Sequence, residues 1–403
     1  MIAEPASTVP PTPDLVLAGG RVLDPANGVD AVADVAVAGG AIVGVGPGLA
    51  ADAGPGVEVV DAEGMLVTPG LIDLHVHIYP GLGNFCVLPD QAGVERGVPI
   101  VVDGGTSGTA TINLARQWLD ASAPKTKVLG FLDPNVLYLA THDFICHKLE
   151  IANDLRNLDT AAAAEALETH ADFLVGFKVR ACHVGDPTVS PFIEAAKELA
   201  GERPIMVHLG RFPHTPTIDT SSLLRTLRGG DIITHACRGA SGVLDAGTGR
   251  PTDAFRDAVE RGVQLDIGHS ATDFRFRDAR RLLAAGFRPD TISTDLNIFN
   301  IDHPVGSLAE TMSKIWALGI PLDEVIAMAT VNSARAIRRD DTYGTLDVGR
   351  PAEISVMRIE EGEALLSDGY ETVTADRRLV PVGCVRGGEW IRATAGLPHA
   401  VAA

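Results

Sequence analysis

Two histidines separated by a single residue carry the first chemical signal in the chain. His75 and His77 close the run PGLIDLHVH at residues 69–77. Because side chains alternate along a strand, both imidazoles would point to the same side. Neutral imidazole nitrogens are common ligands of zinc and neighbouring metals. The run therefore predicts a pair of metal ligands at the end of an apolar strand. Two histidines on an exposed strand face are the alternative.

Later apolar runs end in side chains of the same kind. These runs close with Lys178, His208, His235, His269 and Asp295. In a barrel of parallel strands, catalytic residues gather at the carboxyl ends of the strands. One histidine at such a position is usually a hydrogen-bonded core residue. Several at successive strand ends favour one shared site.

Lys178 suggests a more particular chemistry. A lysine buried at the end of a strand has a lowered pKa, because burial disfavours the ammonium form. The neutral amine can then add carbon dioxide and become a carbamate, an anionic oxygen ligand able to bridge two cations. A lysine that pairs with a carboxylate, or that reaches solvent, is the alternative.

Three further residues are candidates for catalytic roles. Asp295 is expected to ligate a metal and to accept a proton from the attacking water; a helix-capping aspartate is the alternative. Arg180 follows Lys178 by two residues, so it should face the same way and suit a substrate carboxylate. A salt bridge at the barrel rim would also explain it. His269 is expected either to contact substrate or to make a supporting hydrogen bond.

The elements that position these residues recur along residues 68–339. Eight short apolar runs predict strands that alternate with helical segments, which is the pattern of a (β/α)8 or TIM barrel. Gly104 and Gly105, after the second strand, predict a tight turn whose backbone approaches the metals closely. The strands are expected near 71–77, 98–104, 126–133, 172–179, 203–209, 231–236, 262–268 and 291–295. The clearest helices are expected at 108–121, 191–200, 251–260, 273–285 and 304–318.

The two ends of the chain have a different pattern. Residues 14–67 and 340–403 contain short strands with β-branched residues and glycine turns. We expect them to build one small β-sandwich domain, with the barrel inserted between its halves. Residues 1–13 are rich in proline and threonine and are expected to form a disordered tail. The predicted class is α/β.

Composition narrows the range of partners. The chain has 403 residues and a net charge of −19, and an acidic surface argues against binding to nucleic acid or an anionic membrane. Its five scattered cysteines suit reduced thiols. No signal peptide or membrane span is evident. We expect a cytoplasmic protein that acts on a small molecule, and the sequence leaves open whether it forms a homo-oligomer.

The PGLIDLHVH run, Lys178, His208, His235 and Asp295 together resemble the amidohydrolase superfamily in their order. Other segments resemble its dihydroorotase-like deacetylase branch, which includes enzymes acting on N-acetyl amino acids and acetylated hydroxy acids. Those segments are 208–210, 223–225, 230–235, 294–296, 312–314, 317–319 and 330–336.

The resemblance implies two divalent metal ions, expected to be zinc. His75, His77 and Asp295 would hold the more buried ion. His208 and His235 would hold the more exposed one, and carboxylated Lys178 would bridge the two. Asn297 stands where close relatives often have histidine, so no substrate contact is carried over to it.

These features predict a binuclear hydrolase of an amide or ester bond in a small, carboxylate-bearing substrate. An N-acyl amino acid or an acetylated hydroxy acid would be such a substrate. A cyclic-amide hydrolase of the dihydroorotase or hydantoinase type is the first alternative, and a lactonase or phosphotriesterase is the next. A non-catalytic scaffold is expected to lack ligands, and none of the six is missing.

Overall fold

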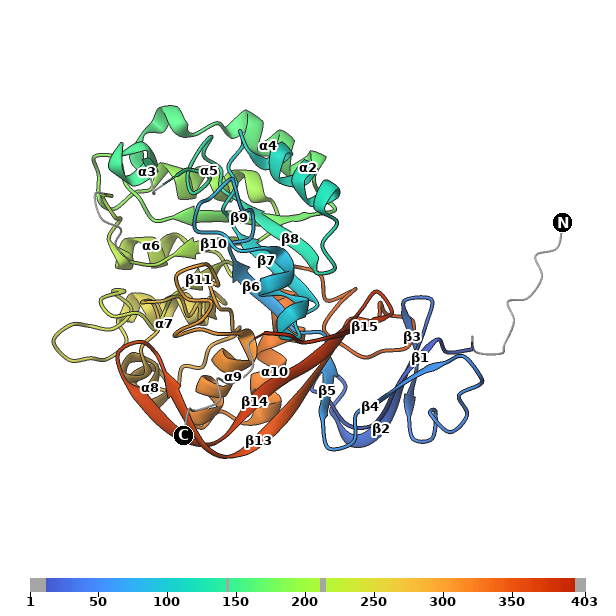
Figure 1. Cartoon of the computed structure of the whole chain (residues 1–403). Coiled ribbons are helices and arrows are strands. Elements are labelled where there is room, and N and C mark those ends of the chain that lie inside the picture. The colour runs from blue at the N-terminus through green and yellow to red at the C-terminus, as the bar shows by residue number, and fades with distance from the viewer. Residues whose placement is uncertain (1–11, 143–144, 211–214, 396–403) are drawn as a thin grey trace.

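Seven parallel strands form one sheet (Figure 1), and three of the six predicted ligands lie in its strands. In the computed structural model, which describes residues 12–142, 145–210 and 215–395, the order of these strands follows the chain. They are buried almost throughout, as expected for strands covered on both faces. They are β6 (Ile72–Val76), β7 (Ile100–Gly104), β8 (Lys127–Leu132), β9 (Leu174–Arg180), β10 (Ile205–His208), β11 (Ile232–Thr234) and β12 (Gln264–Asp266).

The predicted eighth strand, 291–295, is not a regular strand. Instead, two isolated bridges join Thr291 to Asp266 and Leu296 to Val76, so the segment contacts both edges of the seven-stranded sheet. Its backbone departs from strand geometry because Asp295 has a φ of 52°. The Thr294 amide donates to a side-chain carboxylate, that of Asp73, at 3.0 Å. The expectation of eight regular strands is therefore corrected to seven strands and one irregular segment.

Helices follow the strands and lie outside the sheet (Figure 1). Side-chain caps on backbone amides begin α4 to α7 and α9, where they satisfy donors that the helix leaves unpaired. Among the described residues, no helix is long and apolar enough to cross a membrane. The α-helices are α1 (Pro89–Ala92), α2 (Ile112–Ser122), α3 (Ile145–Lys148), α4 (Thr160–Thr169), α5 (Pro191–Ala200), α6 (Thr220–Thr226), α7 (Asp253–Glu260), α8 (Phe276–Ala284), α9 (Leu308–Ala317), α10 (Leu322–Ala329) and α11 (Val331–Ala336). Short 3₁₀ turns lie at Val94–Arg96, Ile151–Asn153 and Leu155–Asn157.

Both ends of the chain contribute to one largely antiparallel sheet. Its order is β15-β14-β13-β5-β1-β2-β3, and β4 also pairs with β1. The N-terminal strands are β1 (Leu15–Asp24), β2 (Val29–Ala38), β3 (Ala41–Gly46), β4 (Glu58–Asp61) and β5 (Leu66–Pro69). The C-terminal strands are β13 (Ile354–Ser367), β14 (Thr372–Arg386) and β15 (Glu389–Arg392).

The expected sandwich of two sheets is thus one hydrogen-bonded sheet. The reason is that β1 is shared: its first half pairs with β4 and its second half with β5. Residues 1–11 of the predicted tail and residues 396–403 lie outside the described part of the chain.

The hairpin β13–β14 is longer than the sheet that it joins. Its distal part runs past α9 toward α8 (Figure 1). There the Phe276 amide donates to the carboxylate of Asp368 at 2.7 Å, and Arg280 pairs with Glu371 at 2.6 Å. One buried hydrogen bond and one exposed ion pair therefore join the hairpin of the terminal sheet to α8.

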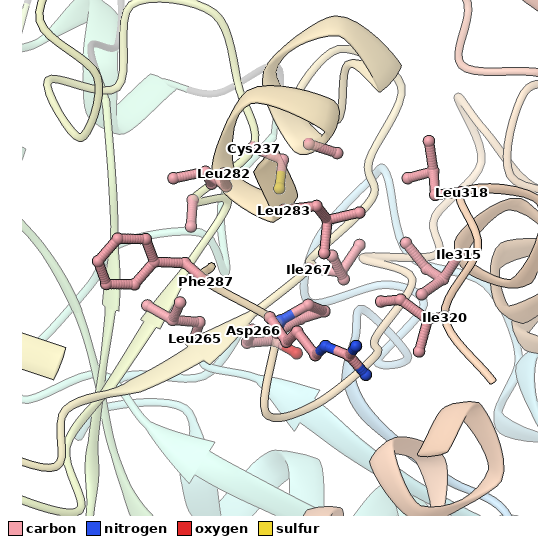
Figure 2. A pocket seen from close by; sticks show the side chains of 14 residues that line it. Cys237, Leu265, Asp266, Ile267, Leu282, Leu283, Phe287, Ile315, Leu318 and Ile320 are labelled. Carbon is pink, nitrogen blue, oxygen red and sulfur yellow. The ribbon is translucent and has the colours of Figure 1, made fainter. Parts of the chain in front are cut away.

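A small void of about 20 Å³ lies between β12, α8 and α9, as Figure 2 shows. Aliphatic side chains such as Leu265, Leu282 and Ile315 make up most of its wall. The void belongs to the packing between sheet and helices and does not contain the predicted ligands.

Candidate metal centre

The first ligand cluster combines residues from the two edges of the parallel sheet. His75 lies in β6, His77 directly follows it, and Asp295 comes from the irregular segment after β12. Oδ1 of Asp295 lies 3.0 Å from Nε2 of His77 and 3.5 Å from Nε2 of His75. All three residues are buried, and their ligand atoms lie within 4.8 Å of one another. This arrangement fits one cation.

Hydrogen bonds behind the two histidines orient their rings. The hydroxyl of Thr106 donates to Asp103 at 2.8 Å, so its oxygen accepts from Nδ1 of His77, which lies 2.7 Å away. Nε2 of His77 then carries the lone pair and faces Asp295. Such supporting contacts fix the tautomer of histidine ligands in metal sites.

His75 is held in the same way. The hydroxyl of Thr234 donates to Asp266 at 2.7 Å and lies 3.3 Å from Nδ1 of His75. Thr291 and Ser293 also donate to Asp266, at 2.8 and 2.6 Å. The lone pair of His75 Nε2 is thereby directed toward Asp295 and Lys178.

The glycine pair after β7 makes room for these side chains. A Cβ atom on Gly104 would lie 2.1 Å from Cδ2 of His75, and one on Gly105 would lie 2.4 Å from Cβ of Lys178. Gly105 also has a φ of 76°, which favours glycine. The backbone at this turn thus lies close to two of the predicted ligands, and its approach to the metals stays a prediction.

Lys178 lies at the centre of the cluster, with no exposed surface. Its Nζ is 2.8 Å from Nε2 of His75. Burial, together with the charge of Arg180, holds the pKa of this amine well below its usual range. A lowered pKa favours the neutral amine, the form that carbamate formation requires.

His208 and His235 form a second cluster beside the first. They end β10 and follow β11, with ring centroids 4.2 Å apart. Nδ1 of His235 donates to the carbonyl of Gly268 at 2.7 Å. Within the described part of the chain, its buried Nε2 has no hydrogen-bond partner. A buried nitrogen without a hydrogen-bond partner is unusual, and a cation bound to it would account for its position.

Two neighbours of this cluster were not singled out from the sequence. Asp273 offers a carboxylate within 4.8 Å of the ligand atoms of His208 and His235. Arg238 bonds Nε2 of His208 at 3.1 Å and pairs with Asp273 at 3.1 Å. Their position in the loops after β11 and β12 was the one signal that the sequence offered.

A cavity of about 340 Å³ opens above both clusters. Its size suits a small molecule. Apart from the ligands it is lined by Phe85, Leu139, Arg180, residues 270–273, Asn297 and Phe299.

Arg180 contributes a buried cation to this cavity. Its Nη1 lies 3.5 Å from both the Asp133 carboxylate and the Gly105 carbonyl, and its guanidinium stacks 4.7 Å from the Tyr138 ring centre. Its Nε, among the described residues, has no hydrogen-bond partner. Burial raises the pKa of Asp133 to about 6, although Arg180 opposes the shift. The guanidinium is thus only weakly paired.

His269 and Asn297 take supporting positions. Nδ1 of His269 lies 2.7 Å from the Ser270 carbonyl, and the ring is buried below the cavity wall rather than in it. Asn297 lines the cavity and donates to the Asp295 carbonyl at 2.8 Å. Of the two roles considered for His269, the structure places it for the supporting hydrogen bond.

Comparison with known proteins identifies the family. Residues 269–384 match the model of the Amidohydrolase family. A protein of Agrobacterium fabrum named a deacetylase is 32% identical over 361 residues, which cover 88% of this chain and 85% of the relative. The chain belongs to the amidohydrolase family. This amidohydrolase is also 32% identical to a deacetylase of Enterococcus faecalis over 350 residues, covering 84% and 90% of the two chains.

Solved structures agree with this assignment. The amidohydrolase superposes on a crystal structure of an adenine deaminase with a TM-score of 0.83 and 28% identity. A dihydroorotase gives a TM-score of 0.82, also at 28% identity. Each match covers 94% of this chain and 99% of the other. These neighbours have a TIM-barrel fold.

The family relationship bears on the metals as well. Amidohydrolases generally use divalent metal ions, and the two His/Asp clusters of this amidohydrolase could hold them. The relatives bear the names of different reactions, namely deacetylase, deaminase and dihydroorotase. Membership therefore establishes a hydrolase and leaves its substrate to be inferred from the cavity.

Proposed function

We propose that this amidohydrolase is a binuclear, zinc-dependent hydrolase of an acyl amide or ester next to a carboxylate. N-acyl amino acids and acetylated hydroxy acids have this chemistry. The observation that carries the proposal is one cavity that is lined by residues of both clusters and by the weakly paired, buried Arg180. The metal centre would act on the substrate carbonyl, and the Arg180 guanidinium beside it would select substrates that carry a carboxylate.

The proposal includes the architecture that positions the site. Residues 68–339 are taken as a closed (β/α)8 barrel in which the segment at 290–296 completes the ring. Residues 14–67 and 340–403 are taken as a separate domain. The bridges from Thr291 and Leu296 to the two edge strands support the ring.

The residues present fit two cations. His75, His77 and Asp295 would hold one ion, while His208 and His235 would hold the other. Lys178, as its carbamate, would bridge them. When bound, two divalent ions polarise a substrate carbonyl and lower the pKa of a water molecule.

Asp295 is the proposed proton acceptor. Burial opposes its ionisation, but the contact with His77, and after it the neighbouring His235 and Lys178, hold its pKa below the usual value. It is therefore a carboxylate at neutral pH. We propose that it takes a proton from the attacking water and returns it to the leaving nitrogen or oxygen.

Arg180 is the proposed anchor for the substrate carboxylate. A guanidinium can make two parallel hydrogen bonds to a carboxylate, which fixes orientation as well as distance. This would aim the neighbouring acyl carbonyl at the ligand clusters, and positioning of this kind is a large part of catalysis.

A cyclic-amide hydrolase is the second candidate. A dihydroorotase structure resembles this chain at a TM-score of 0.82, and a dihydroorotase of Geobacter sulfurreducens is 59% identical over 70 residues. Such an enzyme would use the same clusters and differ in the loops around the cavity. A lactonase would share this chemistry as well.

A hydrolysis screen separates these candidates. Zinc-loaded protein would be offered N-acetyl D- and L-amino acids, acetylated hydroxy acids, cyclic amides and lactones, with each acid paired to its methyl ester. Asp295→Asn serves as the control for contaminating activity. Acetate released from acids but not from esters supports the proposal. Ring opening alone would transfer the assignment to the second candidate, and no turnover of any compound would contradict both.

A further inference from the structure

A second buried lysine lies outside the predicted ligand set. Lys314 is on α9 and has no exposed surface. Its Nζ lies 3.1 Å from Nε2 of His269 and 2.5 Å from the carbonyl oxygen of Pro304. Burial lowers the pKa of Lys314 to about 8, although Glu310 and Asp368 oppose the shift. At neutral pH it is therefore an ammonium with three protons to donate.

The direction of the bond to His269 follows from the other ring nitrogen. Nδ1 of His269 lies 2.7 Å from the carbonyl of Ser270, and a carbonyl can only accept. Nδ1 must carry the proton, so the lone pair on Nε2 accepts from Lys314. Burial, and after it the charge of Lys314, hold the pKa of His269 well below its usual range, which agrees with a neutral ring.

The two acceptors of Lys314 belong to different walls of the cavity. His269 directly precedes residues 270–273, which line one wall. Pro304 ends the loop that begins at Asp295 and carries Asn297. The amides of Val305 and Gly306 donate to the Asn300 carbonyl, each at 3.3 Å. The Asn300 side chain donates in turn to the Asp295 carbonyl at 2.8 Å. Lys314 thus links both walls to one helix.

The hairpin of the terminal sheet closes on the same two loops. Gly369, at the tip between β13 and β14, has a φ of 88°. A Cβ atom there would lie 3.2 Å from the Ala271 carbonyl oxygen and 3.4 Å from Cγ of Pro304. The loops therefore meet beneath the hairpin, at the position where Lys314 ties them.

We propose that Lys314 is a positioning residue that holds the 269–273 loop and the 295–305 loop in register and so sets the shape of the substrate cavity. It touches neither the predicted metal ligands nor the cavity surface. The proposal rests on the proposed site but not on any one substrate. Loss of the link should loosen both walls together, while the predicted ligands on the strands keep their places.

Hydrogen exchange of the metal-loaded protein tests this link without a substrate. Lys314→Met keeps the length of the side chain and removes its donors. We expect faster amide exchange in peptides covering 269–276 and 297–306, with the metal content unchanged. Thr311→Val is the matched control, because Thr311 is also buried on α9 but bonds only within its helix, to the Ser307 carbonyl at 3.2 Å. It should leave both loops unchanged.

Kinetics supply a second readout if the screen yields a substrate. Lys314→Met should raise KM about tenfold and change kcat by less than about twofold, since a lost bond to a charged donor affects binding and not the reacting atoms. If the proposed function is wrong, there will be no substrate for these kinetics. The hydrogen-exchange experiment needs no substrate and still tests the link.

A second variant, at His269, tests the same link in case Lys314→Met does not fold. His269→Phe keeps an aromatic ring but removes both nitrogens, and so breaks the same link from the other side; it should loosen the same two loops. The double variant should be affected less than the sum of the two single variants, because both changes remove the same Lys314–His269 bond, while each also removes a bond of its own, to Pro304 or to Ser270. Additive effects, or unchanged exchange in both single variants, would overturn the proposal.

Discussion

Nζ of Lys178 lies 2.8 Å from Nε2 of His75, and neither side chain reaches solvent. Two positive groups do not persist at this distance inside a protein, and burial lowers the pKa of both. At most one of the two groups therefore carries a positive charge. A buried amine with a lowered pKa, beside the ring nitrogen of a predicted ligand, is where the carbamate is expected, which leads to the first prediction.

Lys178→Ala should lose bound metal and activity together. The carbamate would be the one bridging ligand, so its removal should bring the metal content below about one per chain, read by elemental analysis. Short carboxylic acids added to the variant should restore part of the activity. Lys127→Ala, at the amino-terminal end of the neighbouring strand β8, is the control and should keep its metal. Full activity in Lys178→Ala would exclude the carbamate.

Metal stoichiometry tests the second cluster by itself. Protein purified without chelator should approach about two divalent ions per chain, as in other two-metal sites. His235→Asn removes the unpartnered Nε2 and should lower the content to about one ion. A variant that still binds two ions would show that this nitrogen is not a ligand.

Asp295→Asn keeps the shape of the side chain but removes its basicity. We expect kcat to fall by at least ~100-fold, the lower end of general-base contributions. Asn297→Asp provides a comparison two residues away in the same loop. If kcat for Asp295→Asn stays near the wild-type value, another group takes the proton.

Arg180→Met should separate acids from their esters. Loss of a charge-assisted hydrogen bond costs about 1.5–3 kcal/mol, so kcat/KM for an acidic substrate should fall roughly ten- to a hundredfold. The matching methyl ester should be affected far less. Equal losses on both compounds would mean that Arg180 only shapes the fold against Asp133 and Tyr138.

Glu353 predicts a pH dependence of stability away from the site. Burial raises its pKa to about 7, although Arg386, 3.1 Å away, opposes the shift. The folded state thus binds this proton more tightly than the unfolded state. The resulting stabilisation is complete below pH 4.5 and is lost as the pH rises through about 7.

Glu353→Gln cannot ionise, so it should not lose this stabilisation. Its Tm relative to the wild type should increase between pH 5 and pH 8, by an amount equivalent to roughly 1–3 kcal/mol. Glu361→Gln, an exposed position on β13, which begins directly after Glu353, should show no such trend. A constant difference in Tm across this range would contradict the assignment.

The parallel strands could be predicted because buried strands read as short apolar runs. The run expected at 71–77 contains β6 (Ile72–Val76), and the helix expected at 191–200 is α5. The eighth run has the same composition, but hydrogen bonds from Thr294 to Asp73 replace regular pairing. The pairing of β1 with both β4 and β5 could not be predicted either, because the pattern of residues in a strand does not specify which strands pair with it.

Proximity of the six predicted ligands followed from one rule, that parallel strands end at the same edge. Their roles as ligands stay a prediction. Asp273 and Arg238 lie in loops, where no periodicity marks a side chain. Lys314 stands inside a helix, and its contact with His269 arises only when α9 packs against the loop after β12. Such contacts depend on tertiary packing and leave no local pattern.

The long hairpin has a consequence for synthesis of the protein. A nascent chain that has reached residue 340 already contains all six predicted ligands. The turn around Gly369, which contacts Ala271 and Pro304, has not yet been made. The ligand clusters can therefore assemble on the ribosome before the loops above them receive their outer support. In the order of synthesis, the strands that pack against the cavity loops are thus made after every residue proposed to hold metal.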